Sequence, residues 1–155
     1  MVTARAEAKA EPFVLESLDT TLIPSANRAD GTASTWSTIW KFQVPNGQKM
    51  VLGPDDYFST YLEDASAEVG NNTCRVRIRV TDTSESDVKT PVTPVLYVNV
   101  KEFQDRRKKF RLRVPTPVEV PENYFILVEV YDDGAIDESD SAFELSMTRI
   151  RQGLA

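Results

Sequence analysis

Strict two-residue alternation of apolar and charged side chains is the feature that most constrains how this chain folds. It is clearest in CRVRIRVT, residues 74–81. Because successive side chains of a β-strand point to opposite faces of a sheet, this segment predicts a strand with one buried and one solvated face. The expected inward residues are Val76, Ile78 and Val80, and the expected outward residues are Arg75, Arg77 and Arg79.

Three further segments alternate in the same way, at residues 34–44, where Ile39 is the exception, and at 109–114 and 143–147. Clusters of proline, glycine, asparagine and aspartate separate the apolar segments, as expected for turns. In chain order, the expected inward residues are Trp36, Thr38, Trp40, Phe42, Val44, Phe110, Leu112, Val114, Phe143, Leu145 and Met147. The outward cations of the second of these segments are Lys109, Arg111 and Arg113.

The remaining apolar segments also favour strands. Residues 95–100 and 124–131 are apolar at both odd-numbered and even-numbered positions, which predicts strands covered on both faces. Three prolines within 115–121 predict an extended edge or a crossover between sheets. Residues 57–62 fit both helical and strand spacing, and their neighbours favour a strand. About eight short strands without a convincing long helix predict an all-β fold, a two-sheet antiparallel β-sandwich of the jelly-roll type.

The length of 155 residues fits one domain. Residues 1–12 are rich in alanine, glutamate and lysine and end at Pro12, so we expect a flexible, extended N-terminal arm there. The arm is either a frayed terminus or a segment that becomes ordered against a partner. Residues 13–155 are expected to form the single β-sandwich domain, beginning with an edge strand.

Composition argues against an enzyme. The chain has no histidine, which removes the commonest general base and metal ligand, and it has no glycine-rich phosphate loop. Its single cysteine, Cys74, is better explained as a small buried residue than as a nucleophile. We therefore predict no catalytic residues and no cofactor.

An acidic loop at residues 132–140 leaves one metal hypothesis open. Clustered carboxylates suit calcium, but their spacing does not match an EF-hand loop, and acidic residues are also common in hairpin turns. The carboxylates concerned are Asp132, Asp133, Asp137 and Asp140.

Charge and hydropathy argue against two classes of partner, nucleic acid and membranes. A net charge of −6 argues against nucleic acid, and no stretch reaches the length of a membrane-spanning helix. The first residues lack the apolar core of a signal peptide, so synthesis in the cytoplasm is expected.

Basic residues gather in two places. Between residues 101 and 113 there are seven basic and two acidic residues. If strands 75–79 and 109–113 lie in one sheet, six cations share one face. That face is either a solvated surface that discourages edge pairing or a docking face for an acidic protein. The predicted partner-binding residues are Arg75, Arg77, Arg79, Arg106, Arg107, Lys108, Lys109, Arg111 and Arg113.

Three phrases between about residues 75 and 145 carry a family resemblance: VRIRVTDTSESD, YVNVKEFQDRRKK and VPENYFILVEVYDDGAIDESDSAFEL. With them the chain resembles the decoration or cement proteins of tailed-virus capsids. The resemblance implies a non-catalytic virion protein on the capsid surface. It also implies a homotrimer that binds across junctions between major capsid protein subunits, with the arm extended along the shell.

Two rival functions remain. One is a non-catalytic module that binds a surface or a carbohydrate, and the other is a hydrolase on a jelly-roll scaffold. Carbohydrate modules usually expose aromatic side chains on one face, whereas Trp36 and Trp40 share the expected inward parity, which counts against that class. The missing histidines count against the hydrolase.

Overall fold

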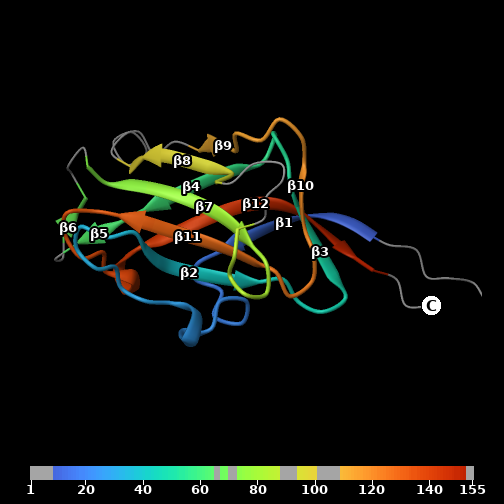
Figure 1. The fold of residues 1–155 in the computed structure, drawn as a ribbon, viewed down its shortest axis with the longest axis horizontal. Coiled ribbons are helices and arrows are strands. Elements are labelled where there is room, and N and C mark those ends of the chain that lie inside the picture. Colours follow the sequence, from blue (N-terminus) through green and yellow to red (C-terminus); the bar gives the residue numbers. More distant parts are fainter. Residues whose placement is uncertain (1–8, 65–66, 70–72, 88–93, 101–108, 153–155) are drawn as a thin grey trace, which may run out of the picture.

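Two antiparallel β-sheets face each other across an apolar core (Figure 1). The computed structural model describes residues 9–64, 67–69, 73–87, 94–100 and 109–152. No helix within these ranges is long and apolar enough to cross a membrane.

The first sheet is built around its longest strand, β12 (Ala142–Arg151). On one side β12 pairs with β1 (Lys9–Glu16) along its length. On the other side it pairs with β3 (Gln48–Leu52) and then β4 (Tyr57–Tyr61), two parts of one interrupted strand. Beyond them lie β10 (Val118–Val120) and β9 (Phe110–Arg111), so the sheet is four strand positions wide.

The second sheet has the order β2-β11-β7-β8. Its strands are β2 (Ser37–Gln43), β11 (Phe125–Tyr131), β7 (Arg75–Thr81) and β8 (Leu96–Asn99). A small hairpin of β5 (Glu63–Asp64) and β6 (Ala67–Glu68) and two 3₁₀ turns, Ser25–Asn27 and Glu138–Asp140, complete the described elements.

The strand order identifies the fold. Counting β3 with β4 and β9 with β10 as single positions, the first sheet has chain positions 1-8-3-6 and the second 2-7-4-5. This interleaving of two four-stranded sheets is the jelly roll. The predicted all-β, two-sheet antiparallel sandwich is therefore confirmed.

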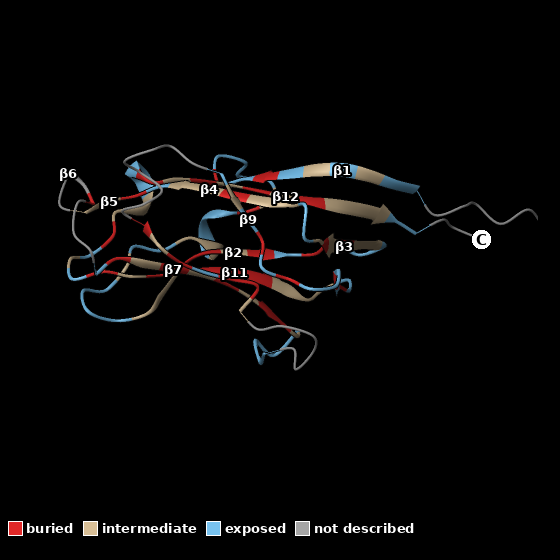
Figure 2. Cartoon of the chain, turned by 90° about the horizontal axis from the view of Figure 1, so that it is seen from above, coloured by how far each residue is buried: buried red, intermediate tan, exposed pale blue. Residues whose placement is uncertain are grey.

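The core lies between the sheets, where the buried residues of the two layers face each other (Figure 2). Trp40, Phe42 and Phe58 are the largest fully buried side chains. The inward residues predicted for β7 and β12 are buried, as is Cys74. The predicted strand at residues 57–62 and the edge position of residues 118–120 are also confirmed.

The inward-facing positions of residues 34–44 shift by one residue along the strand. The predicted inward position is therefore wrong for Trp36 and Thr38. A bulge in the β2–β11 pairing leaves Trp40 opposite Val128 but Thr38 opposite Glu129, so Ile39 is the extra residue. Ile39 is buried, and the residues before it turn toward the outer face of the sheet. A one-residue shift of this kind moves each preceding side chain to the other face.

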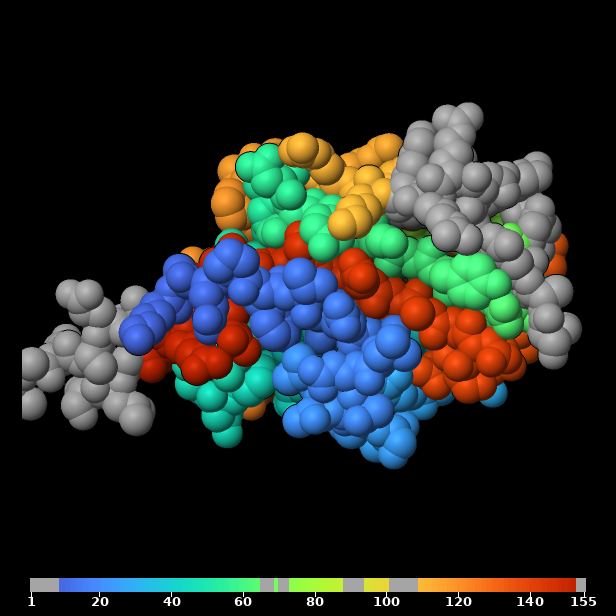
Figure 3. All heavy atoms as spheres, turned by 180° about the vertical axis from the view of Figure 1, so that it is seen from behind, coloured from blue at the N-terminus to red at the C-terminus, as the bar shows by residue number. Residues whose placement is uncertain are grey.

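The last four residues of the expected arm, 9–12, belong to a strand. β1 begins at Lys9, and Pro12 lies opposite Thr148 within the β1–β12 pair. Glu11 forms an ion pair with Arg149 at 2.8 Å. Residues 1–8 lie outside the described residues. Figure 3 shows β1, in blue, beside β12, in red, on the exposed side of the first sheet.

Candidate interaction face

β7 places three arginines on the outer face of the second sheet, as its alternation predicts. Val76, Ile78 and Val80 are buried in the core, whereas the arginines between them are partly exposed. β7 lies between β11 and β8, so these cations lie in the middle of the sheet. We call this outer surface of β2, β11, β7 and β8 the arginine face.

The other predicted cations do not join them. β9 belongs to the first sheet, so Lys109, Arg111 and Arg113 lie outside the arginine face, and the expectation of six cations on one face is wrong. All three are exposed, and Arg111 pairs with Asp55 at 3.0 Å. The predicted binding residues Arg106, Arg107 and Lys108 lie outside the described residues.

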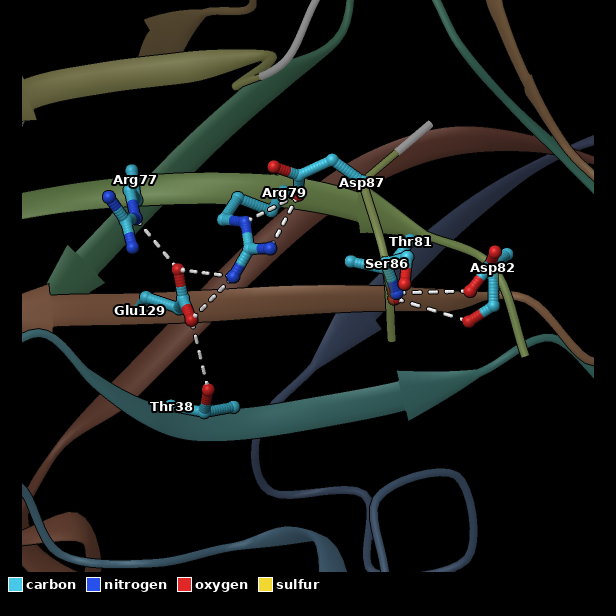
Figure 4. Close-up of polar contacts among 8 residues, drawn as sticks. All are labelled: Thr38, Arg77, Arg79, Thr81, Asp82, Ser86, Asp87 and Glu129. Carbon is cyan, nitrogen blue, oxygen red and sulfur yellow. Dashed lines mark hydrogen bonds and ion pairs between the residues drawn. The ribbon is translucent and has the colours of Figure 1, made fainter. Parts of the chain in front are cut away.

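A buried carboxylate, Glu129 of β11, lies at the centre of the arginine face (Figure 4). Arg77 donates from Nε to Glu129 Oε1 at 2.7 Å, and Arg79 donates from Nη1 to Oε2 at 3.0 Å. The hydroxyl of Thr38 donates to Oε2 at 3.1 Å. Three donors from two neighbouring strands therefore surround this carboxylate.

These contacts show that the arginines of the predicted cation face have a role inside the molecule. An isolated buried carboxylate is very unfavourable, and only charged partners with hydrogen bonds make it tolerable. Arg77 and Arg79 serve that purpose, so their charges are balanced within the molecule. Sequence reasoning missed Glu129, although one acidic residue inside the apolar run FILVEVY was a usable signal.

The loop after β7 neutralises the face further. Arg79 donates from Nε to Asp87 at 2.7 Å, and Lys41 pairs with Glu85 at 2.6 Å. Asp82 holds the turn by accepting from the backbone N–H groups of Ser84 and Ser86. Burial lowers the pKa of Arg79, but the hydrogen bond to Asp87 and the attraction of Glu129 outweigh it and raise the pKa.

Aromatic side chains lie on the same face. The Trp36 ring packs 5.7 Å from the Tyr97 ring and 5.9 Å from the Tyr131 ring, between centroids. The Arg77 guanidinium lies 4.2 Å from the Trp36 centroid, a cation–π contact. Tyr97 is 52% exposed, so the prediction that residues 95–100 are covered on both faces is wrong.

The acidic loop is held by its own hydrogen bonds. Asp133 accepts from the Thr73 hydroxyl at 2.9 Å, and Asp137 accepts from the Ser139 hydroxyl at 2.8 Å. Asp132 is buried and accepts from the Gly134 N–H at 3.1 Å. In the described part of the chain, no three acidic, cysteine or histidine side chains are arranged to hold a metal ion.

Asp132 instead forms a carboxyl pair with Asp64. The hydrogen bond that they share, then burial, then the negative charge of Asp132 raise the pKa of Asp64 to about 6. Burial, followed by the charges of the same two aspartates, raises the pKa of the Cys74 thiol far above its usual value. Both the burial and the direction of this shift disfavour the thiolate, in agreement with the interpretation of Cys74 as a small buried residue.

Comparisons with known proteins bear on the fold. The sequence matches no protein-family profile and no curated protein. VP17, a capsid protein of bacteriophage P23-77, is similar with a TM-score of 0.58 and 7% identity, covering 98% of this chain and 100% of that chain. The VP16-VP17 complex, a complex of the two major capsid proteins of the same phage, gives a TM-score of 0.59 and 8% identity, covering 94% and 100%.

At a sequence identity of 7–8%, the structural similarity shows only that the fold is shared. It extends over nearly the whole chain, so the entire sandwich is shared and not a fragment of it. The structural neighbours agree with the resemblance to phage capsid proteins found in the sequence. The chain has the jelly-roll fold of solved phage capsid proteins.

Proposed function

We propose that this chain is a structural protein of a phage-like virion, in which its jelly roll forms part of the capsid. The observation that carries the proposal is the whole-chain match to capsid proteins of bacteriophage P23-77. The arginine face supports it, because arginines that are neutralised internally suit a rigid building unit better than a reactive site. No catalytic role is assigned to any residue.

In its finer form, the proposal is that the chain decorates and cements the capsid by binding across major capsid protein junctions as a homotrimer. The exposed cations Lys109, Arg111 and Arg113 would then meet acidic subunit surfaces, since Arg77 and Arg79 already hold Glu129. The arm would comprise residues 1–8, because β1 takes up the next residues. Its removal should reduce occupancy on the particle.

Deleting the gene from its source virus tests both forms of the proposal. A shell subunit is required for assembly, so its loss should abolish particles. A cement protein is dispensable for assembly, so its loss should leave particles that break at lower temperature. Particles that are purified from the wild type and contain no copy of the chain by mass spectrometry would refute both.

One observation favours a second function, a non-catalytic surface- or carbohydrate-binding module. Trp36, Tyr97 and Tyr131 lie together on the arginine face, where aromatic rings can stack on a sugar. A glycan array is the test, with Tyr97→Ala as the variant that should lose binding. Absence of binding by the wild type would remove this function.

A further inference from the structure

The turn that joins β2 to β3 contains the one asparagine–glycine pair of the chain, Asn46 and Gly47. The turn spans residues 45–48 and is closed by a hydrogen bond from the Gln48 N–H to the Pro45 carbonyl at 3.2 Å. Gly47 has a φ of 75°, a left-handed conformation that glycine adopts without strain. Both Asn46 and Gly47 are exposed, so water reaches them.

This pair is suited to a reaction of the chain with itself. When the Gly47 amide loses its proton, its nitrogen can attack Cγ of Asn46. An N–Cγ bond forms, the Cγ–Nδ2 bond breaks, and the side-chain nitrogen takes up a proton and leaves as ammonia. Water then opens the resulting succinimide at either carbonyl, which gives aspartate or isoaspartate. Glycine favours the attack because it has no side chain beside the nitrogen, and no atom of another described residue beyond its two chain neighbours lies within 4 Å of where a Cβ would be.

The two reacting groups differ in how they are held. The Asn46 side chain forms no hydrogen bond with any other described residue, so it is free to turn toward the main chain. The Gly47 N–H, in contrast, donates to Glu122 Oε2 at 2.8 Å, a charge-assisted hydrogen bond. The Gly47 carbonyl accepts from the Gln152 N–H at 2.9 Å, so both polar groups of the glycine are engaged.

Glu122 lies in a second turn, residues 121–124, which is joined to the first. Asn123 in this turn has a φ of 67°, and its N–H donates to the Val44 carbonyl at 2.7 Å. Val44 directly precedes the turn at residues 45–48. The main chain therefore fixes the position of Glu122 beside the glycine.

The direction of this hydrogen bond opposes the reaction. The new N–Cγ bond must take the place of the N–H bond, so Cγ has to approach the Gly47 nitrogen from the side that Glu122 occupies. The negative charge of Glu122 also disfavours the amide anion that forms when the proton leaves. We propose that Asn46 is a site of spontaneous deamidation and that Glu122 sets its rate by holding the Gly47 N–H.

The modification changes the turn in two ways. Either product adds one negative charge to each chain, and isoaspartate also lengthens the main chain between β2 and β3 by one CH₂ group. Gln48 lies opposite Arg151 at the end of the β3–β12 pair, directly after the turn. A longer turn should therefore loosen this end of the first sheet before the rest.

Incubation of the full chain at neutral pH, followed by peptide mapping with mass spectrometry, tests the proposal. Trypsin releases residues 42–49, in which fragmentation locates the change at Asn46. Glu122→Ala should deamidate about three- to tenfold faster than the wild type, less than a buried charge-assisted hydrogen bond would give because Glu122 is exposed. Glu122→Gln, which keeps the size but loses the charge, should react at an intermediate rate.

Glu119→Ala is the matched control, because Glu119 is an exposed glutamate of the neighbouring β10 that pairs with Lys49 and not with the turn. It should leave the rate unchanged. In urea, where the structure is lost, the wild type should react faster than in buffer and at the same rate as Glu122→Ala. Circular dichroism shows that each variant is folded in buffer.

Three results would overturn the proposal. One is an unchanged or slower rate in both Glu122 variants, a slower rate meaning that Glu122 acts as a base. Another is an equal acceleration in Glu119→Ala, and the third is an Asn46 that stays intact in the unfolded chain. None of these measurements depends on the role in a virion.

Discussion

Arg77 and Glu129 lie directly opposite each other on β7 and β11, with Nε and Oε1 2.7 Å apart. Glu129 is buried, and Arg79 binds its other carboxylate oxygen. Alternation alone suggests that replacing the β7 arginines with serine leaves stability nearly unchanged. The structure contradicts this, because the replacement leaves a buried carboxylate without its cations.

We therefore expect the double variant Arg77→Ser and Arg79→Ser to lose about 2–4 kcal/mol in the free energy of unfolding, the scale of a broken buried ion pair. Urea denaturation measures the loss. Arg111→Ser is the control, because Arg111 and its ion-pair partner Asp55 are both exposed, and it should change stability much less. Equal effects of the two variants would show that Glu129 does not depend on its partners.

The Asp64–Asp132 pair predicts a pH dependence. The pKa of Asp64 is raised from 3.8 to about 6 in the folded protein, so folding favours its protonated form. The resulting stabilisation is fully present below about pH 4 and is lost as the pH rises through about 6.

The Asp64→Asn variant isolates this contribution, because the amide does not titrate. Melting temperatures of both proteins between pH 4 and pH 7 give the measurement. The difference, wild type minus variant, should fall as the pH rises over this range. A difference that stays constant would mean that the two carboxyl groups do not share a proton.

Gly31 is expected to be sensitive to substitution. A Cβ atom at this position would lie 3.2 Å from the Ile136 backbone nitrogen and 3.2 Å from Ile39 Cδ1. Gly31→Ala should therefore lower the free energy of unfolding by about 1–3 kcal/mol through overpacking. At Gly53 the nearest atom is 3.6 Å away, so Gly53→Ala should be neutral or stabilise by up to about 1 kcal/mol. Equal denaturation midpoints would contradict this difference.

The N-terminal boundary gives another prediction. Deleting residues 1–12 removes half of β1 and the Glu11 ion pairs, and should cost about 1–3 kcal/mol, the scale of a few backbone hydrogen bonds. Deleting residues 1–8 leaves β1 whole and should preserve stability. If both truncated chains melt at the wild-type temperature, β1 contributes nothing before Phe13.

The fold was predictable because burial at alternate positions is a local pattern. Val76, Ile78 and Val80, like Phe143, Leu145 and Met147, needed only period-two spacing to be assigned to the core. Prolines in the 115–121 segment likewise indicated the edge position of β10. The number of strands and the absence of a convincing long helix indicated a sandwich of the jelly-roll type, but the strand order itself came only from the structure.

The site was less predictable because it depends on pairing between distant strands. The bulge at Ile39 moved Trp36 to the outer face. Ile39 was the one apolar residue that broke the alternation of residues 34–44, but a single exception does not specify a bulge. Sequence alternation showed that Arg77 points outward but not that Glu129 lies beside it, 52 residues away. Nor could it assign β7 and β9 to different sheets.

The central claim, that this jelly roll is a building or covering unit of a capsid, is tested most directly by electron cryo-microscopy of the source virus. At a resolution that separates strands, the shell map should contain density that fits both four-position sheets of this chain, in many symmetry-related copies. A complete map of the shell and its surface proteins, with every density assigned to other chains, would contradict the account.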